Sequence, residues 1–132
     1  MSHEILWVDD DMDEWLLDLF AQEFRERDIH IQGARSIIAG IEALRQYSFD
    51  AVVLDMLFKG EEAGGREIWN GLRNGVLRGP SGSDLRELPV IFATAFVGPP
   101  SPLFEEDAHT YIIHKPFDPP TIVELVANIL GE

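Results

Sequence analysis

Five short apolar runs alternate along the chain with longer segments in which apolar side chains recur every three or four positions. The runs cover residues 5–8, 29–32, 51–54, 90–93 and 111–114. Those at 5–8, 51–54 and 90–93 are continuously apolar, which is typical of parallel strands covered on both faces. Residues 29–32 alternate apolar and polar side chains, as a half-exposed strand at a sheet edge does. The pattern predicts five strands.

The segments between these runs predict helices. Residues 12–24 place apolar side chains on one helical face and charged side chains on the other. Ser36 is expected to cap a second helix, and Asp118-Pro119-Pro120 to start the last one, which Gly131 ends. Because parallel neighbours need crossover connections, this alternation predicts an α/β fold, with a doubly wound parallel sheet between two layers of helices.

Glycine and proline interrupt the pattern twice. Residues 60–82 hold seven of the eleven glycines, which predicts a weak helix over 65–77 and a long loop through 79–83. We expect residues 60–82 to be the most mobile part of the domain and to include a partner-contact surface. The run Gly98-Pro99-Pro100-Ser101-Pro102 leaves room for only a short fourth helix before the last strand.

Composition excludes several classes of protein. The 132 residues suit one domain, residues 1–132, with no effector domain, and 24 acidic against 10 basic side chains give a net charge of -14. A chain this acidic lacks the positive field by which proteins attract nucleic acids and anionic membranes. Neither is therefore expected as a partner. The absence of cysteine excludes disulfides, thiolate metal sites and cysteine nucleophiles. With neither a bilayer-spanning run nor a signal-peptide pattern, a cytoplasmic location is expected.

Polar residues stand where the predicted strands end. Asp9 and Asp10 follow the first strand, Asp55 the third, Thr94 the fourth and Lys115 the fifth. The carboxyl ends of strands in an open parallel sheet share one edge, where ligands bind. Each residue taken alone has an ordinary explanation as a helix cap, a strand-end hydroxyl or a surface lysine. Five such residues at one edge are much less expected by chance.

Three carboxylates at one edge need a cation, because each pair repels by roughly 4 kcal/mol at about 4 Å in an effective dielectric of about 20. With oxygen ligands and no cysteine, the best candidate is Mg²⁺ that keeps part of its water shell. A carboxylate beside magnesium, an ammonium group and a hydroxyl is a phosphoryl-transfer site in outline. The cations offset charge on the transferring oxygens while a carboxylate oxygen attacks.

These residues resemble the receiver domain of two-component response regulators. Four motifs carry the resemblance, namely Leu6-Trp7-Val8-Asp9-Asp10 for the acidic pair, Val53-Leu54-Asp55 for the phosphoacceptor strand, Ala93-Thr94-Ala95 for the switch threonine and Lys115-Pro116-Phe117 for the lysine motif. They occur in family order over nearly the whole chain. The resemblance implies a flavodoxin-like (βα)5 sandwich whose five parallel strands lie in the order 2-1-3-4-5, with residues 29–32 at one edge.

The resemblance also implies a role for each site residue. Asp55 would accept a phosphoryl group from a histidine kinase or a histidine phosphotransfer protein. Asp9, Asp10 and Asp55 would bind Mg²⁺ together with the backbone carbonyl of Leu57. Lys115 would pair with the phosphoryl group, and Thr94 would move to bond it. Enzymatic activity would then be limited to self-phosphorylation and self-dephosphorylation, and a stand-alone receiver would signal through protein contacts.

Three features depart from the family pattern. Lys59 stands where a proline is usual, and residues 65–89 form a longer, glycine-rich stretch than the family has. Ile112 occupies the usual position of an aromatic switch residue, while Tyr111 is expected to face the opposite side of the strand. The alternative function is therefore a receiver-like docking module that acts without phosphorylation.

The sequence disfavours a nucleotide-binding P-loop protein and a phosphatase with an aspartyl nucleophile, because each lacks a required residue. Residues 60–65 have the glycine spacing of a phosphate-binding P-loop, but Arg66-Glu67 replaces the lysine and the hydroxyl residue that such a loop requires. A phosphatase with an aspartyl nucleophile would normally carry a second aspartate two residues after Asp55, where Leu57 stands.

Overall fold

A computed structural model describes residues 2–9, 14–55, 64–94, 108–114 and 117–131. Its strands are β1 (His3–Val8), β2 (Ile29–Ala34), β3 (Ala51–Asp55), β4 (Val90–Thr94) and β5 (Thr110–His114). Its helices are α1 (Glu14–Arg25), α2 (Ile37–Gln46), α3 (Gly64–Arg73) and α5 (Pro119–Leu130), with a short 3-10 helix η1 (Pro80–Gly82). The short fourth helix expected before β5 falls at residues outside the described ones.

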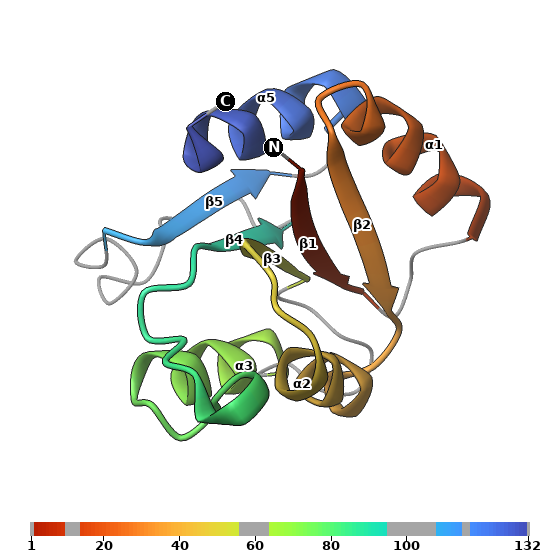
Figure 1. Cartoon of the computed structure of the whole chain (residues 1–132). Helices are drawn as coiled ribbons and strands as arrows, with labels where there is room; N and C mark the ends of the chain where they lie inside the picture. The colour runs from red at the N-terminus through yellow and green to blue at the C-terminus, as the bar shows by residue number, and fades with distance from the viewer. Residues whose placement is uncertain (1, 10–13, 56–63, 95–107, 115–116, 132) are drawn as a thin grey trace.

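The strands form one parallel sheet in the order β2-β1-β3-β4-β5. This is the predicted order, and β2 lies at an edge as its alternating pattern indicated. Helices α1 and α5 cover one face of the sheet, and α2 and α3 cover the other (Figure 1). None of the helices among the described residues has the length and apolar character needed to cross a bilayer.

The sheet is buried on both faces because each inner strand sends alternate apolar side chains to opposite layers. Ile5 and Trp7 pack with α1 and α5, whereas Leu6 and Val8 pack with α2 and α3. Residues 51–54 of β3 are fully inaccessible to solvent. Full burial of a valine or leucine side chain contributes about 1.5–3 kcal/mol to folding. The two apolar cores therefore hold the strand ends in a common register.

Local capping signals set the ends of α2 and α5 as predicted. The Ser36 hydroxyl accepts a hydrogen bond from the Ala39 amide, at 3.0 Å. The Asp118 carboxylate accepts bonds from the hydroxyl and the amide of Thr121, which lower the pKa of Asp118. Gly131 ends α5 in the left-handed conformation, with φ 79°, which glycine adopts without strain.

Helix α3 differs from the predicted span of 65–77, because it ends at Arg73. Gly75 has a φ of 80° and turns the chain out of the helix. The Leu77 amide then donates to the Gly71 carbonyl, at 2.8 Å, and the Leu77 side chain is buried. Burial of Leu77 in the core thus stops the helix four residues earlier than the sequence pattern indicated.

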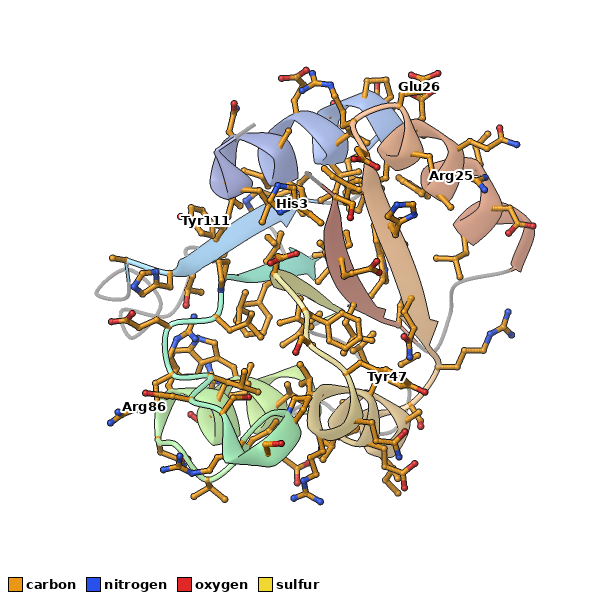
Figure 2. All side chains as sticks on the ribbon, viewed as in Figure 1. His3, Arg25, Glu26, Tyr47, Arg86 and Tyr111 are labelled. Atoms are coloured by element: carbon orange, nitrogen blue, oxygen red, sulfur yellow. The ribbon has the colours of Figure 1, made fainter. Side chains whose placement is uncertain are left out.

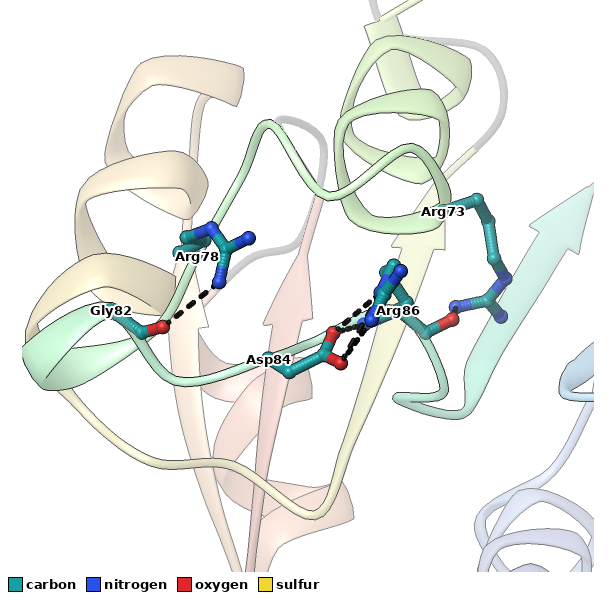
Figure 3. A network of polar contacts seen from close by, with 5 residues as sticks. All are labelled: Arg73, Arg78, Gly82, Asp84 and Arg86. Atoms are coloured by element: carbon teal, nitrogen blue, oxygen red, sulfur yellow. Dashed lines mark hydrogen bonds and ion pairs between the residues drawn. The ribbon is translucent and has the colours of Figure 1, made fainter.

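The loop from 74 to 89 is held by contacts along most of its length. Leu88 is buried, the Gly79 amide donates to the Ser83 carbonyl at 3.0 Å, and the Arg78 guanidinium donates to the Gly82 carbonyl at 3.2 Å (Figure 3). These contacts favour an ordered loop. The expected mobility of residues 60–82 stays a prediction, and residues 60–63 lie outside the described ones.

Arg73 connects α3 to the amino-terminal ends of β4 and β5. Its Nη1 donates to the carbonyls of Arg86 and Leu88, at 3.1 and 2.8 Å. Its Nη2 donates to the His109 carbonyl and the Thr110 hydroxyl, at 3.0 and 3.2 Å. One half-buried guanidinium therefore joins α3, residues 86–88 and residues 109–110 at the amino-terminal ends of β4 and β5; Figure 3 shows Arg73 beside Arg86.

Asp84 and Arg86 form an exposed ion pair (Figure 3). Its contribution to stability is expected to depend on pH. Hydrogen bonds from the Arg86 side chain and amide lower the pKa of Asp84 from 3.8 to about 2. The pair therefore contributes stability above pH 3.8, and this contribution is lost as the pH falls towards 2. A carboxyl NMR titration should place the Asp84 midpoint near 2, and Arg86→Gln should return it towards the ordinary value.

Arg78→Gln is the matched control for that titration, because Arg78 attracts the Asp84 carboxylate only through a weaker, longer-range interaction. It should change the midpoint much less than Arg86→Gln does. An Asp84 midpoint that stayed low in Arg86→Gln would contradict the assignment. Because the pair is exposed, the accompanying change in unfolding free energy should be small.

Candidate functional site

The carboxyl ends of the strands meet at one edge of the sheet, called the carboxyl edge below. Asp9 directly follows β1, Asp55 ends β3 and Thr94 ends β4. His114 ends β5 and directly precedes Lys115 in the sequence. The fold therefore brings the backbone positions of Asp9, Asp55 and Thr94 to the same edge, as predicted.

Strand register places Asp9 and Asp55 side by side. Val8 of β1 is paired with Leu54 of β3, so Asp9 and Asp55 are the next residues along two neighbouring strands. Adjacent strands are about 4.8 Å apart. Asp55 is in turn paired with Ala93, the residue before Thr94. Two carboxylate-bearing positions and one hydroxyl-bearing position thus occupy three consecutive strands.

Asp9 is the buried charged residue of the described part of the chain, with 6% of its surface exposed. Its amide donates to the Ala34 carbonyl at 2.9 Å, which extends the β1–β2 ladder by one residue. Burying a carboxylate is costly without compensating charges or hydrogen bonds, and this chain has a net charge of -14. The burial of Asp9 sets it apart from the other charged residues of the described part of the chain.

The chemistry of these positions fits a hard divalent cation. A buried carboxylate beside a second carboxylate position offers the oxygen ligands that Mg²⁺ prefers. Asp10, Leu57 and Lys115 lie outside the described residues, as do the side chains of Asp55 and Thr94, so their assigned roles stay predictions. Within the described ranges no group of three metal-ligating side chains occurs.

The side chains of Ile112 and Tyr111 on β5 face opposite sides of the sheet, as the sequence predicted. Ile112 packs against the core on the side of α2 and α3, whereas Tyr111 packs against the core on the side of α1 and α5. Figure 2 shows Tyr111 on the α5 side of β5. The position three residues before Lys115 therefore presents an aliphatic side chain to the α3 side.

Sequence reasoning did not identify a group of three rings that lies beneath the carboxyl edge. Trp7 of β1, Phe20 of α1 and Phe117, which lies between β5 and α5, form what we call the aromatic cluster. Its ring centroids are 5.2 Å apart for Trp7 and Phe20, 6.2 Å for Trp7 and Phe117, and 5.9 Å for Phe20 and Phe117. The available signal was the single tryptophan in an otherwise aliphatic strand, two residues before Asp9.

The indole of Trp7 is buried with an unsatisfied donor. Trp7 is 2% exposed, and its Nε1 finds no hydrogen-bond acceptor among the described residues. A buried donor without a partner costs about 1–3 kcal/mol. This cost is set against the burial of the ring and its two ring contacts.

Comparison with known proteins identifies the fold. No protein-family model and no curated protein sequence matches the chain. A CheY-like receiver domain from Methanospirillum hungatei aligns with a TM-score of 0.74 and 21% identity, over 99% of this chain and 95% of that one. The receiver domain of a Francisella response regulator aligns with a TM-score of 0.73 and 17% identity, over 98% of both chains.

A third similar structure is the receiver domain of a sensor histidine kinase from Pseudomonas aeruginosa. It aligns with a TM-score of 0.69 and 15% identity, over all of both chains, and holds a magnesium ion in its active site cleft. These matches cover nearly the whole chain. The chain therefore has the fold of response regulator receiver domains, and the predicted resemblance is confirmed at the level of the fold.

Proposed function

We propose that this chain is a receiver domain that accepts a phosphoryl group on Asp55 and signals through protein contacts. The observation that carries the proposal is the strand register, which sets Asp55 beside the buried Asp9 at the carboxyl edge of a receiver fold. The phosphoryl donor would be a histidine kinase or a histidine phosphotransfer protein. A cytoplasmic location belongs to the same proposal.

In the proposed reaction, one carboxylate oxygen of Asp55 attacks the phosphorus atom of a phosphohistidine. The new O–P bond forms as the N–P bond breaks, and the imidazole nitrogen of the donor keeps the electron pair. Such a transfer depends mainly on positioning and on charge stabilisation. Lys115 would pair with the phosphoryl oxygens, and Thr94 would hydrogen-bond one of them.

Asp9, Asp10, Asp55 and the backbone carbonyl of Leu57 would hold a magnesium ion. When bound, the ion would offset the negative charge that gathers on the phosphoryl oxygens. Burial of Asp9 supports this assignment, because a carboxylate already removed from water has fewer water contacts to lose when the cation binds.

Magnesium binding is expected to depend on Asp10. Asp10→Ala should weaken the affinity for Mg²⁺ by about tenfold or more, since changes to groups that merely support a ligand cost about 10–100-fold. Calorimetric titration of the parent and the variant measures this. Asp11→Ala is the matched control, because it removes the same charge at the next residue and should change the affinity far less. Equal loss in the two variants would mean that only overall charge matters.

The direct test of the proposed function is treatment with acetyl phosphate and Mg²⁺, followed by intact-mass measurement. The expected result is a gain of one phosphoryl group. A chain that binds its partners yet gains no mass would instead be a receiver-like docking module acting without phosphorylation.

A further inference from the structure

The aromatic cluster joins two parts of the sheet that are not neighbours. In the strand order β2-β1-β3-β4-β5, both β3 and β4 separate β1 from β5. Three strand spacings correspond to roughly 14 Å. Phe117 lies three residues beyond the end of β5, yet its ring packs against Trp7 of β1. The cluster therefore forms a direct contact between the first strand and the chain that leaves the last one.

Both sides of this contact lead to the carboxyl edge. Trp7 precedes Asp9 by two residues, and the β1–β2 ladder continues as far as Asp9. Phe117 directly precedes Asp118, whose carboxylate caps α5. His114, at the end of β5, is paired with Thr94 of β4. Phe117 thus lies between the end of β5 and the start of α5, and its ring packs against the core.

Phe20 adds the third side of the cluster from α1. Its ring contacts both Trp7 and Phe117, so α1 covers the point where the other two rings meet. Trp7 and Phe20 are buried, and Phe117 packs against the same core. Three mutual ring contacts leave each ring little freedom to shift alone, because aromatic pairs prefer a narrow range of separations.

We propose that Trp7, Phe20 and Phe117 are positioning residues for phosphorylation of this chain, an inference that rests on the proposed function. Their contact fixes the end of β1, which Asp9 directly follows, relative to Phe117 before the start of α5. Phosphoryl transfer is sensitive to such placement. The indole N–H of Trp7 finds no acceptor among the described residues, so the ring contributes through its packing in the cluster.

The test compares Trp7→Leu and Phe117→Leu with Phe24→Leu as the matched control. Phe24 is fully buried in the same core but is not part of the aromatic cluster. For each variant, the melting temperature, the affinity for Mg²⁺ and the rate of mass gain from acetyl phosphate are measured, at a temperature where all variants are folded. Phe117→Tyr keeps the aromatic ring and serves as the conservative variant.

The two cluster variants should lose about tenfold or more in phosphorylation rate, because displacements near 1 Å cost about that much or more. Phe24→Leu should stay within about twofold of the parent rate although it also lowers the melting temperature. Phe117→Tyr should keep a rate close to that of the parent. Rates that fall in step with melting temperature in all the leucine variants would show that the cluster acts only as core.

Failure of the proposed function has a different signature. A parent chain that neither binds Mg²⁺ nor gains a phosphoryl group overturns the phosphorylation proposal, and the positioning role with it. A parent that does both, with cluster variants that behave like Phe24→Leu, overturns the positioning role alone.

Discussion

Asp55→Asn is expected to abolish the gain of one phosphoryl group that the parent chain shows with acetyl phosphate and Mg²⁺. The amide lacks the anionic oxygen that attacks phosphorus, so the loss should be complete within the detection limit of intact-mass measurement. The loss should persist at any donor concentration, since it removes the acceptor rather than weakening donor binding.

Asp50→Asn is the matched control, because Asp50 directly precedes β3 and therefore lies at the opposite end of the strand that Asp55 ends. Its carboxylate accepts a hydrogen bond from the Glu4 amide at 2.8 Å, so the variant tests the same chemical change away from the carboxyl edge. It should be phosphorylated like the parent. A full mass gain in Asp55→Asn would assign the phosphoryl group to another residue.

Arg73→Ala is expected to lower the free energy of unfolding more than alanine substitution of any other partly exposed side chain among the described residues. The guanidinium donates four hydrogen bonds to two segments, residues 86–88 and 109–110, and its removal takes one donor away from three carbonyls and one hydroxyl. Loss of a charged donor of this kind costs about 3 kcal/mol. For a domain of this size, the melting temperature should fall by about 10 °C.

Two further variants make the Arg73 prediction specific. Arg45→Ala removes an exposed arginine from the last turn of α2 and should change the unfolding free energy by no more than about 0.5 kcal/mol. Arg73→Lys keeps the charge, but a single ammonium cannot reproduce the forked geometry, so it should recover only part of the stability. Equal denaturation midpoints for Arg73→Ala and Arg45→Ala would contradict the role given to Arg73.

Local signals in the sequence were enough for the elements and for the positions of the candidate site. Continuously apolar runs predicted the buried strands, and the alternation at 29–32 predicted an edge strand. Ser36, Asp118 and Gly131 predicted helix ends, because a cap is satisfied by atoms a few residues away. Asp9, Asp55 and Thr94 could be assigned to one edge because parallel strands end together.

Tertiary contacts decided the features that no local pattern encodes. Helix α3 ends at Arg73 because Leu77 is drawn into the core, which overrides the helical spacing that extended to 77. Arg73 binds groups up to 37 residues away, so its role depends on how α3 packs beside β4 and β5.

At the candidate site, too, some features follow from the sequence and others only from tertiary packing. The residue types and order of Asp9, Asp55 and Thr94 were determined by the sequence, because strand ends can be located from apolar runs. Their register, the burial of Asp9 and the contact between Trp7 and Phe117 were decided by the packed sheet. The reason is physical, since periodicity reports which face a side chain takes, whereas only packing decides which distant side chains share that face.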